Sequence, residues 1–163
     1  MKDRNPITLV VSEQGGRRPA LVAGPGHQVL AVHQQDGELL AALTTRVSAA
    51  ADLVKLQGGT VERAYLVCNG RTDGAALVAR LLMATTLIAA LCAAGGGQIV
   101  LSTDPSFNDQ ARPHLLGLAE ALVQLTRDPR IEVRSSFDAP SGVLGSARRA
   151  PAEAPRGAGA MPA

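Results

Sequence analysis

The stretch that decides the fold runs from VERAYLVC (residues 61–68) through the apolar segment 74–94 to QIVLS (98–102), and then through 109–125 to RIEVR (130–134). Short runs rich in Val and Ile predict strands, and the longer segments between them predict helices. A strand–helix–strand–helix–strand order is typical of a parallel sheet covered by helices. Ligands of such proteins usually bind beyond the carboxyl ends of the strands.

The first third of the chain predicts further strands at 7–11, 20–23 and 28–32. Gly24-Pro25-Gly26 separates the last two, and such a turn favours an antiparallel hairpin. A helix is expected over 37–57, with Asp36 as its N-cap and glycines at its end. The predicted fold class is therefore α/β with a mixed sheet, in which an N-terminal antiparallel β-β-β precedes α-β-α-β-α-β with parallel strands. The expected architecture is analogous to that of ribonuclease-H-like or Rossmann-like three-layer proteins. The analogy concerns architecture only, since no motif connects the chain to a family.

Residues 139–163 contain mostly Ala, Pro, Gly and Arg without periodicity, which predicts a disordered tail after a single domain over 1–138. The tail holds three Arg and one Glu, so it carries the whole net charge of +2. The domain has no basic excess, which argues against nucleic acid as its partner and leaves only a weak contact through the tail. The three aromatic residues, Tyr65, Phe107 and Phe137, are too few for a base-stacking platform.

Cys68 and Cys92 form no CxxC pair, so the sequence predicts neither a disulfide scaffold nor a zinc site. The first residues lack the apolar segment of a signal peptide, and a cytoplasmic protein without a cofactor is expected. The segment 74–94 is apolar almost throughout, and Arg80 is its one charge. Such a helix is either the central helix of the domain or packs one side against a second protein, and a membrane span is the least favoured alternative.

The most site-like residues follow two predicted strands, in the turns 69–74 and 102–106. They are Asn69, Gly70, Arg71, Thr72, Asp73, Ser102, Thr103 and Asp104. Glycines, an arginine and a following helix N-terminus suit a small anionic ligand such as a nucleotide. The structural alternative is an ordinary strand-to-helix turn with Thr72 or Asp73 as N-cap.

The sequence supports other catalytic or metal-binding sites less well. Two-metal hydrolysis would need converging carboxylates, for which Glu13, Asp73, Asp104 and Asp138 are the candidates, but each is explained as a turn or cap residue. Cys68 and His114 are the one pair that topology could bring together for nucleophilic catalysis. His27 and His33 lack an acid or Cys partner, so no metal site is predicted.

The leading hypothesis is a non-catalytic interaction module whose partner is another protein or a second copy. The contact is expected through the helix 74–94, with Met83, Leu87 and Leu91, or through an edge strand. The alternative is a domain that binds, or a hydrolase that cleaves, a small anionic ligand at the two turns.

Overall fold

The computed structural model describes residues 5–14, 20–23, 28–103, 108–136 and 141–144. The strands are β1 (Asn5–Ser12), β2 (Ala20–Ala23), β3 (Gln28–His33), β4 (Gly59–Cys68), β5 (Gly97–Thr103), β6 (Ile131–Ser136) and β7 (Ser141–Leu144). The helices are α1 (Leu40–Leu56), α2 (Gly74–Ala93) and α3 (Asn108–Leu125).

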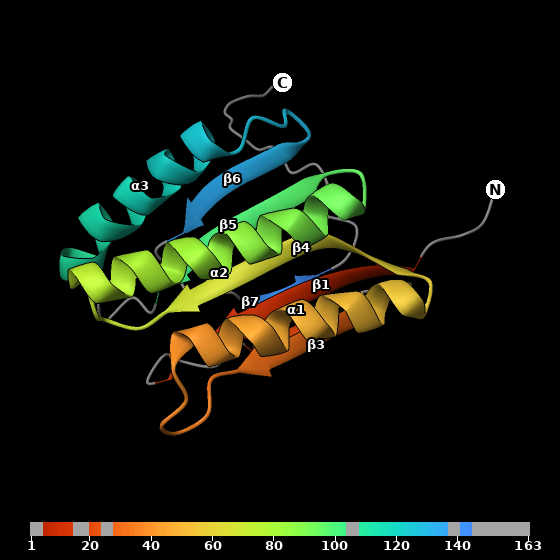
Figure 1. Cartoon of the computed structure of the whole chain (residues 1–163), viewed down its shortest axis with the longest axis horizontal. Helices are drawn as coiled ribbons and strands as arrows, with labels where there is room; N and C mark the ends of the chain where they lie inside the picture. Colours follow the sequence, from red (N-terminus) through yellow and green to blue (C-terminus); the bar gives the residue numbers. More distant parts are fainter. Residues whose placement is uncertain (1–4, 15–19, 24–27, 104–107, 137–140, 145–163) are drawn as a thin grey trace.

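Five strands form one sheet in the order β3-β1-β4-β5-β6, and every neighbouring pair is parallel. The three helices lie side by side on one face of this sheet, while β7 lies behind it (Figure 1). β7 pairs with β2 in a separate parallel two-stranded sheet. The α/β class with a three-layer arrangement is therefore confirmed.

The predicted antiparallel N-terminal strands are wrong. β1 lies between β3 and β4 and is parallel to both, and β2 belongs to the other sheet. Thr8, Leu9, Val10 and Val11 are all buried, so β1 is covered on both faces, as is usual for a central strand of a parallel sheet. The expected turn at 24–26 lies outside the described residues.

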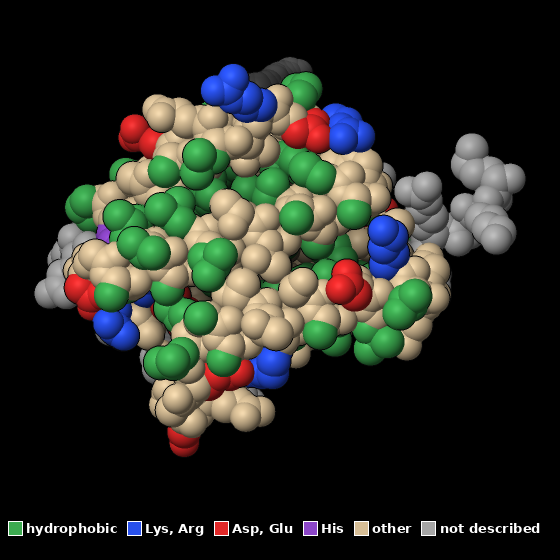
Figure 2. All heavy atoms as spheres, in the orientation of Figure 1, with side chains coloured by type: hydrophobic (Ala, Val, Ile, Leu, Met, Phe, Trp, Pro, Cys, Tyr) green, Lys and Arg blue, Asp and Glu red, His purple; other side chains and the backbone are tan. Residues whose placement is uncertain are grey.

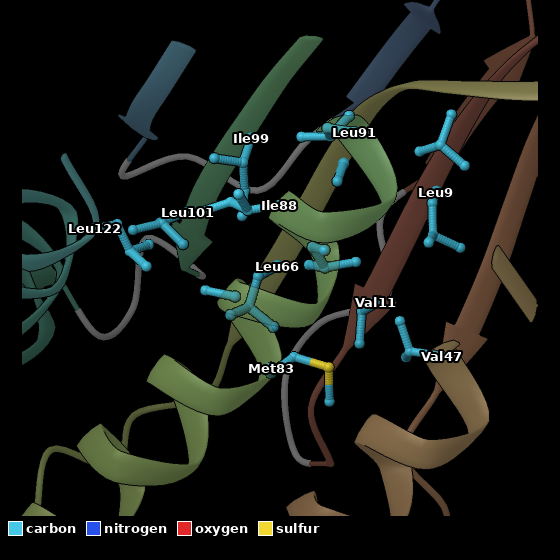
Figure 3. Close-up of a cluster of buried hydrophobic side chains, with 14 of the residues drawn as sticks. Leu9, Val11, Val47, Leu66, Met83, Ile88, Leu91, Ile99, Leu101 and Leu122 are labelled. Carbon is cyan, nitrogen blue, oxygen red and sulfur yellow. The ribbon is translucent and has the colours of Figure 1, made fainter. Parts of the chain in front are cut away.

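The core lies between the helices and the sheet. Its members from the strands include Leu9, Val11, Leu66, Ile99 and Leu101, and helix residues pack against them (Figure 3). Leu residues dominate because the chain is poor in aromatic side chains. Each such buried aliphatic side chain contributes about 1.5–3 kcal/mol.

Helix α2 is the central helix of the layer, between α1 and α3, but Val78 and Leu82 on its outer side are exposed, so it is not buried all round as the first of the two sequence-based alternatives requires. Its length and its mean hydropathy of 2.1 would suit a membrane-crossing helix by composition alone, and core helices of other proteins pass the same test. Here α2 packs through Met83, Leu87 and Leu91, all fully buried, against the sheet and its neighbouring helices.

Two differences from the predicted boundaries have a clear structural cause. Helix α1 begins at Leu40 rather than 37, and Asp36 does not cap it: its carboxylate accepts a hydrogen bond from Gln14 Nε2 at 2.8 Å instead. Residues 141–144, assigned from sequence to the tail, form β7, because they pair with β2 over four residues. The rest of the tail, 145–163, lies outside the described residues.

Candidate functional site

The carboxyl ends of β1, β4 and β5 lie at one edge of the sheet. Cys68 is in register with Thr103, and Ser12 is in register with Val67. The turn that follows β4 therefore lies beside the end of β5, as the sequence predicts. Glu13 continues β1 at the same edge, where its backbone N–H donates to the Val67 carbonyl at 2.9 Å.

A buried ion pair joins this edge to α2. Arg80 donates from Nε to Glu13 Oε2 at 2.8 Å and from Nη2 to Glu13 Oε1 at 2.7 Å, which is a two-bond, fork-like contact. Both side chains are only 1% exposed. Glu13 Oε1 also accepts from the backbone N–H of Asn69 at 2.9 Å, so the carboxylate holds the turn after β4.

The remaining donors of Arg80 are satisfied by the turn itself. Nη1 donates to the Arg71 carbonyl at 2.6 Å, and Nη2 donates to Asn69 Oδ1 at 3.0 Å and to the Asn69 carbonyl at 3.3 Å. An arginine that is buried without such partners would be strongly destabilising. Since every guanidinium nitrogen of Arg80 already donates to a protein acceptor, this side chain serves to stabilise the fold.

His114 on α3 completes this network. Its Nε2 lies 2.9 Å from Arg80 Nη1. A guanidinium can only donate, so Nε2 must be the acceptor and the ring is neutral with its proton on Nδ1. Burial, followed by the positive charge of Arg80, lowers the pKa of His114, although a hydrogen bond to the Thr72 backbone opposes the shift.

The turn 69–74 is organised by its own side chains. Asn69 Oδ1 accepts from the Arg71 N–H at 2.9 Å, and Asn69 Nδ2 donates to the Gln14 carbonyl at 2.8 Å. Arg71 pairs with Asp73 at 2.9 Å. Asp73 Oδ1 in turn accepts from the Ala76 N–H at 2.8 Å, which confirms Asp73 as the N-cap of α2.

The other predicted ligand-binding residues offer little to a ligand. Ser102 and Thr103 are fully buried, and Thr103 Oγ1 donates to the Cys68 carbonyl at 3.4 Å. Gly70 is half-buried, and Thr72 is exposed. Asp104 lies outside the described residues, as do Asp138 and His27.

Nucleophilic catalysis by Cys68 finds no support at this edge. Cys68 is fully buried, and burial, with a further contribution from the Glu13 charge, raises the pKa of its thiol far above the ordinary value. A nucleophilic cysteine needs the opposite shift. Among the described residues, no group of three or more His, Cys, Asp or Glu side chains is placed to hold a metal ion.

Sequence reasoning considered Glu13 and His114 separately and missed their connection through Arg80. A signal was present, because a single charge within an otherwise apolar helix must find a buried partner or reach solvent. The partner lies 67 positions away in the chain, so spacing alone does not reveal it.

The second candidate surface is the outer face of the helix layer. Met83, Leu87 and Leu91, predicted as contact residues, face the core and are not accessible to a partner. The exposed residues of α2 are instead Val78, Leu82, Thr85, Ala89 and Ala93, together with its first two residues. We call these five residues the outer stripe. Figure 2 shows apolar side chains over this region of the surface.

A groove adjoins the carboxyl-terminal half of the stripe. It lies between α1 and α2 at the start of β4 and has a volume of about 520 Å³. Small side chains of α2, including Ala89, Ala90 and Ala93, form one wall, and Asp52 and Lys55 of α1 lie on the other.

Comparison of the chain with protein-family models, with curated proteins and with solved structures found no match.

Proposed function

We propose that this protein is a non-catalytic α/β module that acts by protein–protein contact, first of all with itself, through the outer stripe of α2. The observation that carries the proposal is the absence of charge on that face. All 20 residues of α2 are described, and its one charged residue, Arg80, is buried toward the sheet. A helix that faces water on one side normally carries charged residues there.

The stripe also exposes large apolar side chains. Val78 is 67% exposed and Leu82 is 49% exposed. Leu53 on α1 and Leu116 and Val123 on α3 are further exposed apolar residues in the same layer. Large exposed apolar patches in soluble proteins usually mark interaction sites.

The turn 69–74 supports the alternative, a small-anion site, less well. Arg80 is fully engaged with Glu13 and the turn, and Arg71 is paired with Asp73. An anion would have to compete with carboxylates that are already in place. Thermal-shift screening with nucleotides tests this alternative: a rise in the melting temperature that Arg71→Ala abolishes would favour it.

Sedimentation velocity tests the proposed function. The wild-type protein is expected to sediment as an oligomer at roughly 100 μM, and Leu82→Asp is expected to be monomeric, because burying an unpaired carboxylate in the contact is strongly unfavourable. Leu82 is half exposed, so circular dichroism should show an intact fold in the variant.

Leu39→Asp is the matched control. Leu39 is 74% exposed, precedes α1 and does not line the groove between α1 and α2, so its substitution should leave the oligomer unchanged. A wild-type protein that stays monomeric at this concentration would overturn the proposal of self-association.

A further inference from the structure

The shape of the outer stripe is uneven along α2. Its amino-terminal half carries the larger side chains, Val78 and Leu82, which form a ridge. Its carboxyl-terminal half carries Ala89 and Ala93, and these two residues also line the groove between α1 and α2. One helix thus presents a ridge at one end and a hollow at the other.

We propose that the occupant of the groove is the Val78–Leu82 ridge of a second copy, in an antiparallel α2–α2′ dimer with its twofold axis between Thr85 and Thr86. The inference rests on the proposed function and specifies its partner and geometry. Two identical surfaces related by a twofold axis must be self-complementary, and a ridge and a hollow on one helix satisfy this requirement only when the helices run in opposite directions.

The spacing of the residues agrees with this axis. Leu82 lies three positions before Thr85 and Ala89 lies three positions after Thr86, so they face each other across the axis. Val78 and Ala93 lie seven positions before and after the same two threonines and are paired in the same way. Each large side chain of one copy therefore meets an alanine of the other.

The two threonines at the axis can be buried without leaving a hydroxyl group unpaired. Thr85 Oγ1 donates to the Leu82 carbonyl at 2.8 Å, and Thr86 Oγ1 donates to the same carbonyl at 3.1 Å. Both hydroxyls are thus already satisfied within the helix. A contact at this point does not leave an unpaired polar group, which would otherwise oppose association.

The available area is adequate for a stable dimer. A helix of 20 residues is about 30 Å long at ~1.5 Å per residue. Three adjacent helices spaced ~8–10 Å apart give a layer roughly 25–30 Å wide. The resulting face of about 800 Å² per copy covers all three helices, so a standard interface, which requires about 800 Å² of each partner, needs contacts from α1 and α3 as well as from the outer stripe.

Disulfide trapping in a Cys92→Ser background tests the register, since Cys68 is buried and Cys92 is only partly so. Leu82→Cys/Ala89→Cys is expected to oxidise to a covalent dimer, because the two positions face each other across the axis. Leu82→Cys alone is the matched control and should stay largely unlinked, whereas a parallel pair of helices would bring the two copies of position 82 together.

A size exchange gives an independent measurement that does not depend on oxidation. Leu82→Ala leaves a void and Ala89→Leu adds a clash, and each is expected to weaken dimerisation at least about fivefold, which corresponds to ~1 kcal/mol. Leu82→Ala/Ala89→Leu exchanges ridge and hollow and should recover most of the lost affinity.

The outcomes separate the two proposals. A dimer in which Leu82→Cys alone crosslinks as well as the double variant, or in which the exchanged variant is weaker than both single variants, overturns the antiparallel register and leaves self-association standing. A monomeric wild-type protein overturns self-association itself.

Discussion

Arg80 ties together segments that are far apart in the chain, and its contribution to stability should be large. Replacement by Met keeps the length of the side chain but leaves the buried Glu13 carboxylate without its partner. Breaking one side of a buried ion pair costs about 3–5 kcal/mol. We therefore expect Arg80→Met to lower the free energy of unfolding by this amount in urea denaturation.

The double variant Glu13→Gln/Arg80→Met distinguishes an unpaired charge from lost packing. It removes both charges, while the amide oxygen of the new glutamine can still accept the Asn69 N–H, so the double variant should be less destabilised than the sum of the two single variants. Arg71→Ala is the control, because its ion pair with Asp73 is exposed and should matter little. Additive effects of Glu13→Gln and Arg80→Met would contradict the assigned coupling.

His114 should make stability depend on pH. Its pKa in the folded protein lies below the ordinary value of 6.5, because burial and Arg80 disfavour the imidazolium, although Glu13 and Asp73 partly offset this. The unfolded chain therefore binds more protons as pH falls, and the contribution of His114 is present above pH ~6.5 and lost below it. Urea denaturation at pH 7.5 and 5.5 should show the loss, and His114→Gln should reduce it. An equal loss in His114→Gln would assign the effect to other groups.

At the residue scale, sequence reasoning identified Asp73 as a cap because capping is local, a matter of three residues. It could not identify the Glu13–Arg80–His114 network, whose members come from the end of β1, from α2 and from α3. Which polar groups meet in a core depends on how the elements pack, and that information is not contained in any short window of sequence.

At the scale of the elements, the link between α2 and β5 requires backbone conformations that favour glycine. Gly95, Gly96 and Gly97 have φ values of 100°, 120° and 156°. A Cβ on Gly96 would lie 2.6 Å from Arg130 Cβ and 2.7 Å from the Arg130 carbonyl oxygen. Only glycine fits this close approach of two chain segments.

Gly96→Ala is accordingly expected to lower the free energy of unfolding by about 1–3 kcal/mol, the usual cost of forcing a residue with a side chain into such a backbone conformation. Gly117 provides the opposite case. It is exposed on α3, and a Cβ at this position would have no other atom within 4 Å, so Gly117→Ala should raise stability by roughly 0.5–1 kcal/mol through helix propensity. Thermal denaturation of both variants measures this pair of opposite shifts, and a tolerated Gly96→Ala would show that the link can relax.

Helices and strands from residue 59 onward were predictable because their periodicity and glycine-marked ends are local signals. The pairing of β1 was not, although the run Ile7–Val11 carried a clue: a strand apolar at nearly every position suits the centre of a parallel sheet better than a hairpin. The turn signal at 24–26 outweighed it in the prediction, yet a turn fixes only the local direction of the chain.

For the whole molecule, the order of elements indicated an α/β fold with its helices over a parallel sheet, and this part was correct. The two-stranded sheet of β2 and β7 joins segments more than 100 residues apart, so it follows from the completed fold rather than from sequence patterns. The location of the exposed apolar face could likewise not be predicted, because α2 is apolar almost throughout and its sequence has no periodicity that shows which side faces the core.

Self-association would make the stability of the molecule depend on its concentration. A dimer that forms only from folded chains stabilises them by mass action, so the melting temperature should rise between about 1 and 100 μM protein. Leu82→Asp removes the contact and should melt at the same temperature throughout this range. Because the stripe is exposed in the single chain, wild type and variant should converge at low concentration. A variant that melts well below the wild type even there would show that Leu82 supports the fold of the single chain, and the stripe would then belong to the core rather than to an interface.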